Sequence, residues 1–195
     1  MFDRTFLQIL TFNEKKQLKR ICDKSCHLTY FEEKVYMFRK ILVAMDNSED
    51  SKHIFEKALS LAKLTNAHLM LLHVLSPEDE GYPNMELQPS LSYYAGRHEQ
   101  IDSYLKRLKE FEERGIEILR SRSAKATTAG VKAEFCQNTG NPRWSICDLA
   151  RTWDADLIVM GHRDRIRLKE MGLGSVSNYV THNAHCSVLI VQDNG

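Results

Sequence analysis

The sequence LIVMGHRDRIRLKEMGLGS, residues 157–175, joins a short apolar run to a basic loop and a Gly-Ser pair. An apolar run with β-branched residues that ends at a glycine is typical of a buried parallel strand leading into a loop. The segment after Gly174 has helical periodicity, and we expect Ser175 to cap that helix. Glycine lets backbone N–H groups approach a ligand, and a helix N-terminus supplies unpaired donors and a positive dipole. The stretch therefore predicts a phosphate-binding loop between a strand and a helix.

Strands and helices are predicted to alternate from residue 39 onward. The expected strands are residues 41–45, 68–75, 131–136, 157–160 and 186–191, and the expected helices are residues 48–65, 100–128, 142–153 and 175–183. This alternation predicts an α/β fold: a doubly wound, five-stranded, mainly parallel sheet with helices on both faces. Ligands of such sheets bind outside the carboxyl ends of the strands. Asp46, Val74, Gly140 and Gly161 fall at or just after predicted carboxyl ends, so we expect the site there.

The composition is that of a globular protein with one hydrophobic core. Of 195 residues, 43% are hydrophobic and 27% are charged. The net charge of +1 argues against nucleic-acid binding, which needs concentrated positive charge. The apolar runs are too short to span a membrane, and Gln8 interrupts the apolar residues near the start, so we expect no membrane span and no signal peptide. Five cysteines without framework spacing favour a reducing compartment, and we expect a cytoplasmic protein.

The first 36 residues differ from the rest of the chain. They are rich in Lys and Glu and contain no Gly or Pro. We therefore expect an N-terminal extension at residues 1–36 and one domain at residues 37–195. One hypothesis is that translation starts at Met37; the alternative is a poorly ordered N-terminal arm. A mass of the native protein that includes Met1 would contradict the first hypothesis.

Several blocks of this sequence resemble the universal stress protein family. In chain order they are RKILVAMDNSE (residues 39–49), LMLLHVLSP (69–77), Gly140-Asn141-Pro142, DADLIVMG (154–161) and CSVLIVQ (186–192). The spacing from Gly161 to Gly174-Ser175 resembles the nucleotide-binding signature of the family, except that Asp164 stands where the signature has a glycine. The resemblance runs over residues 37–192, about four-fifths of the chain.

This resemblance implies a Rossmann-like fold of the adenine nucleotide α-hydrolase type that binds ATP or AMP, with or without Mg²⁺. Asp46 would bind the ribose or the base edge, Val74 would lie against the adenine, and Ser175 would donate to phosphate. Taken alone, the same residues fit a turn, a core position and a helix cap. The implied nucleotide-binding residues are Ala44, Asp46, Val74, Met160, Gly161, Arg163, Asp164, Gly174, Ser175, Val176 and Ser177.

Asp164 weakens the prediction of triphosphate binding. A carboxylate about 6 Å from one phosphate charge costs roughly 3 kcal/mol at an effective dielectric near 20, and less with exposure and salt. The nearby cations Arg163, Arg165, Arg167 and Lys169 offset part of that repulsion. We expect weakened rather than lost binding. A monophosphate, or magnesium between Asp164 and the phosphates, would be affected less.

The resemblance favours a stress-response module in which the nucleotide changes contacts with a protein partner. It also implies a homodimer formed through the final strand, which is otherwise an exposed edge. One alternative is a family member that no longer binds ATP and acts through protein contacts only. Asp164 favours this alternative. Another is a slow ATPase or phosphotransferase, for which Asp164 with a metal is the one candidate group. The sequence predicts no catalytic residue and no metal-ligand set, since its histidines are too scattered and Cys22, Cys26 and His27 match no zinc or haem spacing.

Overall fold

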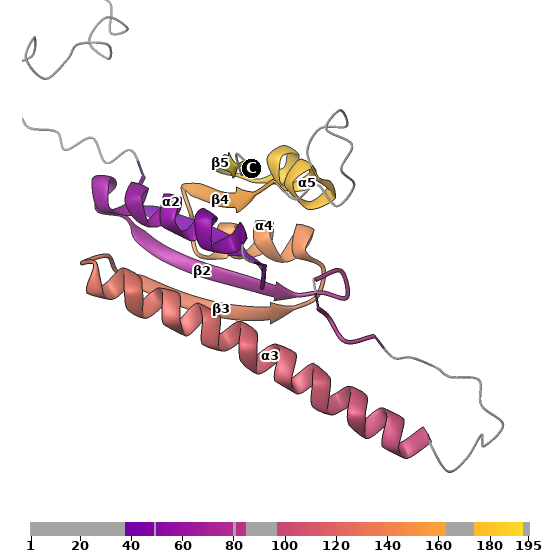
Figure 1. The fold of residues 1–195 in the computed structure, drawn as a ribbon. Coiled ribbons are helices and arrows are strands. Elements are labelled where there is room, and N and C mark those ends of the chain that lie inside the picture. Colours follow the sequence, from indigo (N-terminus) through magenta and orange to yellow (C-terminus); the bar gives the residue numbers. More distant parts are fainter. Residues whose placement is uncertain (1–37, 49, 80, 85–96, 163–173, 193–195) are drawn as a thin grey trace, which may run out of the picture. The chain divides into compact units, whose positions relative to one another are not determined.

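The computed structural model describes residues 38–48, 50–79, 81–84, 97–162 and 174–192. All of them belong to the unit Tyr36–Gly195, the second of two units into which the chain divides. Strands and helices alternate along it as predicted (Figure 1). The elements are β1 (Lys40–Met45), α2 (Asp50–Thr65), β2 (His68–Leu75), α3 (Arg97–Thr128), β3 (Ala133–Thr139), α4 (Pro142–Thr152), β4 (Leu157–Gly161), α5 (Ser175–Asn183) and β5 (Ser187–Val191).

The five strands form one sheet in the order β3-β2-β1-β4-β5, and every neighbouring pair is parallel. The chain therefore winds outward from β1 to β3, and then returns to the other side of β1 to add β4 and β5. This confirms the predicted doubly wound α/β fold, with a sheet that is wholly parallel. The strand order reverses between β1 and β4, which is where such a sheet forms its ligand crevice.

The core lies in two layers, one on each face of the sheet. Ile41 and Val43 of β1 pack with residues of α2 and α3, whereas Leu42, between them, packs with residues of α4 and α5. Successive side chains of a strand point to opposite faces, so one apolar run supplies both layers. The prediction of helices on both faces is confirmed. Figure 1 shows α3 running along β3 and continuing past the carboxyl end of that strand.

Several element boundaries differ from the sequence prediction, and three of them have a visible structural cause. The first helix begins at Asp50 rather than at residue 48, because the Asp46 carboxylate holds the backbone N–H and the hydroxyl of Ser48 in a turn. The third strand covers Ala133–Thr139 rather than residues 131–136, because Gly130 (φ +82°) and a bond from Val131 N to Ala126 O end α3 first. That strand continues to Thr139 because its ladder with β2 runs to Leu75. Within the described residues, no helix combines the length and apolarity needed to cross a membrane.

Candidate functional site

Four of the predicted site residues lie together on the face of the sheet that α4 and α5 cover. Ala44, Val74 and Met160 come from β1, β2 and β4, three adjacent strands, and each stands at or near the carboxyl end of its strand. Val176 of α5 packs against the same cluster. Val74 and Met160 are buried, while Ala44 is half-buried. We call these four residues the apolar cluster; it could form one side of a pocket for a flat ring.

The start of α5 lies beyond the end of β4 and differs from the prediction. The N-cap is Gly174 (φ −59°, ψ 160°), and Ser175 is already the first helical residue, so the predicted cap at Ser175 is wrong. The carbonyl of Gly174 accepts the first helical bond, from Asn178 N at 2.8 Å, and also a bond from the Ser177 hydroxyl at 3.0 Å. Gly174 has no side chain to cap the helix, and no side chain of the described residues takes that place. Within the described part of the chain, the first N–H groups of α5 therefore remain as donors that an anion could use.

Asp46 follows β1 directly, as predicted, and its carboxylate already has a structural role. Its Oδ1 accepts a hydrogen bond from Ser48 N at 3.0 Å and one from the Ser48 hydroxyl. Both bonds stabilise the turn that leads into α2. Of the two roles that the sequence allowed for Asp46, a turn residue or a nucleotide ligand, this is the turn role. A role for Asp46 in ligand binding remains a prediction.

Gly161 ends β4 and is explained by packing. A Cβ added at this glycine would lie 2.6 Å from Cδ1 of Ile54 on α2, on the face opposite to the apolar cluster. The absence of a side chain thus lets α2 lie close to the end of β4. Sequence reasoning treated Gly161 as a residue that admits a ligand, and it did not foresee this contact.

Arg163 and Asp164 lie outside the described residues. Their predicted roles, including the repulsion between Asp164 and a triphosphate, remain predictions.

Similarity to known proteins agrees with this fold. The model of the universal stress protein family matches residues 37–192. This chain belongs to the universal stress protein family. Universal stress protein Sll1388 of Synechocystis sp. (strain ATCC 27184 / PCC 6803 / Kazusa) is 36% identical to it over 157 residues, 80% of this chain and 98% of that protein.

Two solved structures of universal stress proteins show the same fold. UspA from Lactobacillus plantarum gives a TM-score of 0.57 at 22% identity, over 78% of this chain and 97% of that one. The Arabidopsis thaliana protein At3g01520, solved with AMP bound, gives a TM-score of 0.51 at 23% identity, over 80% of this chain and 93% of that one. At these identities the likeness is one of fold.

The thiols that the structure describes in this universal stress protein are weak nucleophiles. Cys136, Cys147 and Cys186 are the free cysteines of the described residues. Burial raises the pKa of all three thiols, which therefore remain protonated at neutral pH. In the same part of the chain, no group of three or more His, Cys, Asp or Glu side chains is arranged to hold a metal ion.

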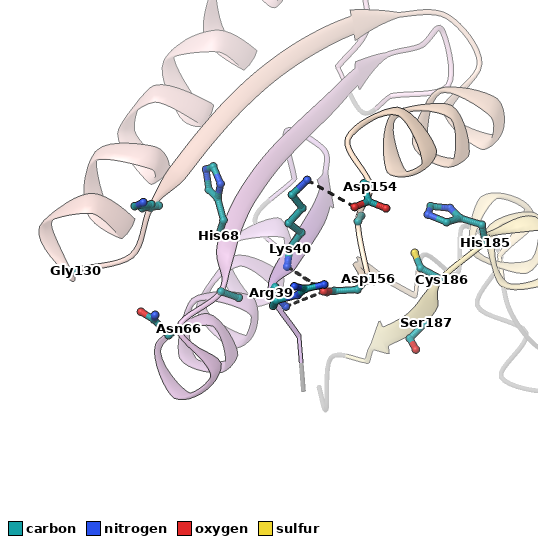
Figure 2. Close-up of a pocket in the computed structure, with 13 residues that line it drawn as sticks. Arg39, Lys40, Asn66, His68, Gly130, Asp154, Asp156, His185, Cys186 and Ser187 are labelled. Atoms are coloured by element: carbon teal, nitrogen blue, oxygen red, sulfur yellow. Dashed lines mark hydrogen bonds and ion pairs between the residues drawn. The ribbon is translucent and has the colours of Figure 1, made fainter. Parts of the chain in front are cut away.

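A cavity of about 1040 Å³ lies at the opposite edge of the sheet, where the strands begin (Figure 2). None of the predicted site residues lines it. Its lining residues are Arg39, Lys40, Asn66, Ala67, His68, Gly130, Lys132, Asp154, Ala155, Asp156, His185, Cys186 and Ser187.

Several charged groups of this cavity hold the protein's own structure together. The Lys40 ammonium donates to the carbonyl of Trp153 at 2.9 Å and lies 4.0 Å from the Asp154 carboxylate. The Asp156 carboxylate accepts the backbone N–H groups of Arg39 and Lys40, at 2.8 Å and 3.2 Å. Figure 2 shows the ion pair to Asp154 and the bonds to Asp156, which join the start of β1 to the segment between α4 and β4. We therefore place the candidate site at the carboxyl edge, where helix donors are available.

Proposed function

We propose that this universal stress protein binds an adenine nucleotide at the carboxyl edge of its sheet and that binding changes its contacts with a protein partner. The observation that carries the proposal is the start of α5, which no described side chain caps, beside the apolar cluster. The helix N-terminus offers donors and a positive dipole to a phosphate, and the cluster offers an apolar surface to the purine ring. The relative from Arabidopsis thaliana that was solved with AMP bound supports the choice of ligand.

Within this proposal, Val74 and Met160 lie under the base, Asp46 binds the ribose, and the N–H groups of residues 175–177 bind the phosphate. Among the predicted polar ligands that the structure describes, Ser177 is the least exposed, and its hydroxyl donates to Gly174 O. Its backbone N–H is therefore the better candidate for a contact with phosphate. The aspartate at position 164 favours a monophosphate, because each added phosphate charge increases the repulsion. Magnesium bridging Asp164 and the phosphates would reduce that difference.

The test is isothermal titration of the full chain with AMP, and with ATP in the presence and absence of Mg²⁺. We expect a micromolar Kd for AMP and weaker binding of ATP without Mg²⁺. GMP is the control for the base and should bind more weakly than AMP. If the folded protein gives no heat with either adenine nucleotide, the proposal is wrong. The alternative, a universal stress protein that acts through protein contacts without a nucleotide, then takes its place.

We also propose that two copies pair through β5. This strand is one edge of the sheet, and Leu189 on it is 41% exposed. An unpaired edge strand presents a row of N–H and C=O groups to another strand, and a two-fold pairing would satisfy both edges. Light scattering should give the mass of a dimer for the wild type and of a monomer for Leu189→Lys. A wild-type monomer at all concentrations would contradict this pairing.

A further inference from the structure

Two buried side-chain nitrogen atoms of the described residues have no hydrogen-bond partner, Nδ2 of Asn47 and Nε2 of His73. His73 of β2 packs against α3, where Gln137 contacts its Nδ1 at 3.1 Å and Asp79 faces its Nε2 at 3.4 Å. The polar groups around this histidine therefore belong to the protein itself. Asn47 differs, because it stands between β1 and α2, at the carboxyl edge of the sheet.

The amide nitrogen of Asn47 is more deeply buried than the residue that carries it. Residue 47 as a whole is half-buried, whereas its Nδ2 is covered. A buried amide that has lost its contact with water and gained no acceptor is unfavourable, and such groups are rare in native proteins. An acceptor supplied by a ligand explains the amide, provided that the fold itself does not need an asparagine at this position.

The two usual structural reasons for an asparagine do not apply at position 47. Asparagine is favoured where the backbone is left-handed, but among the described residues the non-glycine positions with positive φ are Asn66 and Asp154. Asparagine is also favoured where its side chain closes a turn. Here Asp46 closes the turn, because its Oδ1 accepts the N–H and the hydroxyl of Ser48.

Asn47 follows the strand at which the order of the sheet reverses. β1 is the central strand, with β2 on one side and β4 on the other. The crevice at such a point is where parallel sheets bind their ligands. Ala44 of the apolar cluster precedes Asn47 by three residues, and Asp46 precedes it directly. The unpaired amide therefore neighbours two of the residues that we propose to bind the nucleotide.

A ribose hydroxyl is the acceptor that best suits this donor. With its phosphate on α5 and its base on the apolar cluster, the proposed nucleotide has its sugar near the end of β1. A hydroxyl donates one hydrogen bond and accepts others, so a carboxylate and an amide N–H can bind the same group from two sides. Asp46 would accept from the sugar, and Asn47 would donate to it.

We propose that Asn47 is a ribose-binding residue, whose Nδ2 donates to a hydroxyl oxygen of the nucleotide and makes the site select ribonucleotides over deoxyribonucleotides. This inference rests on the proposed nucleotide site. Rotation about the two side-chain bonds of Asn47 brings the amide to the ligand. A nucleotide without the hydroxyl leaves the amide unpaired, and a site that hydrogen-bonds a hydroxyl discriminates against an analogue that lacks it.

The test is calorimetric titration of the full chain with AMP, 2′-deoxy-AMP and 3′-deoxy-AMP. We expect the wild type to bind one of the two deoxy nucleotides roughly tenfold more weakly than AMP, which identifies the hydroxyl. Asn47→Leu removes the donor and should lower the affinity for AMP to about that of this deoxy nucleotide. Because Nδ2 makes no hydrogen bond within the described residues, the variant should unfold at no lower temperature than the wild type.

Nitrogen-15 spectra of the wild type give a second readout. The side-chain NH₂ signal of Asn47 should move on addition of AMP and should move far less with the weaker deoxy nucleotide. Asn183→Leu is the matched control. Nδ2 of Asn183, at the other end of α5, already donates to the carbonyl of Tyr179 at 2.8 Å, so this change should leave the preference for AMP unaltered.

Equal affinity of the wild type for all three nucleotides would overturn the role of Asn47 and leave the nucleotide site in place. An Asn47→Leu variant that keeps the full preference for AMP would overturn it too, as would a side-chain signal that AMP leaves unmoved. A wild type that binds none of the three would contradict the proposed function, and this inference with it. The wild-type measurements decide the matter even if Asn47→Leu fails to fold.

Discussion

Two helices begin at the same edge of the sheet, and their first turns are built differently. The first residue of α4 is Pro142, which has no N–H, and the side chain of Asn141 accepts the N–H of Arg143 at 3.0 Å. At α5 the N-cap is Gly174, and no described side chain caps the helix. At α4 one donor is thus absent and the next is satisfied internally, whereas no described side chain occupies the donors of α5. One capping residue decides whether a helix start serves the fold or can serve a ligand.

Placing a carboxylate at the start of α5 should give the largest effect. In Gly174→Asp, the new side chain can cap the helix and interact with its dipole, and the backbone at Gly174 (φ −59°) accepts any residue. We expect the affinity for AMP to fall roughly tenfold or more, about 1.4 kcal/mol, while the protein becomes no less stable. Titration calorimetry and thermal unfolding measure the two effects. Unchanged affinity would mean that phosphate does not bind at α5.

The matching change at α4 should affect stability alone. Asn141→Ala removes the bond to Arg143 N, and loss of such a cap costs about 1 kcal/mol. We expect a lower midpoint of unfolding and an AMP affinity within about twofold of the wild type. A large loss of affinity in Asn141→Ala would show that the start of α4 belongs to the binding site.

Ser175→Ala tests whether the Ser175 hydroxyl contacts the nucleotide or caps α5. Because Ser175 is exposed and is the first helical residue, its loss should leave the free energy of unfolding within about 0.5 kcal/mol of the wild type. Loss of one hydroxyl donor should weaken AMP binding by a few-fold, roughly 1 kcal/mol or less. Denaturant unfolding and calorimetry together check this. A destabilisation of about 1 kcal/mol would restore Ser175 as the cap.

The smallest effect concerns Cys147, a buried thiol of α4. Burial, followed by the charge of Asp148, raises the pKa of this thiol, so its thiolate fraction at pH 8 is below that of an ordinary cysteine. Alkylation by iodoacetamide, followed at the Cys147 peptide by mass spectrometry, should be slow at pH 8 and still increasing above about pH 9. A rate that levels off at lower pH would contradict the raised pKa.

The sheet could be predicted because buried parallel strands leave a strong local signal. Runs such as KILVAM and HLMLLHVL are apolar on both faces, and β1 and β2 lie within one residue of their predicted bounds. The predicted end of β3 was wrong because the strand closes with Gln137, Asn138 and Thr139. These polar residues are held in the sheet by their pairing with β2, a contact that local sequence does not reveal.

The details of the site depend on backbone angles and on distant contacts. Gly174 and Ser175 both suit a helix cap, and only the dihedral angles separate the N-cap from the first helical residue. His73 was considered only as a metal ligand, because its partners Gln137 and Asp79 come from other segments. One signal was present in the sequence. Gly115 stands inside a segment that otherwise consists of good helix-forming residues, and such a glycine indicates that another part of the chain lies close to the helix backbone.

The central claim is that an adenine nucleotide binds at the carboxyl edge, with its phosphate on α5. Amide chemical-shift mapping of the full chain with AMP tests it most directly. We predict that the largest changes fall on Ser175, Val176 and Ser177, with a second group around Val74. Changes that fall instead on His68, Lys132 and Ser187, at the cavity where the strands begin, would contradict the claim, as would a spectrum that AMP leaves unaltered.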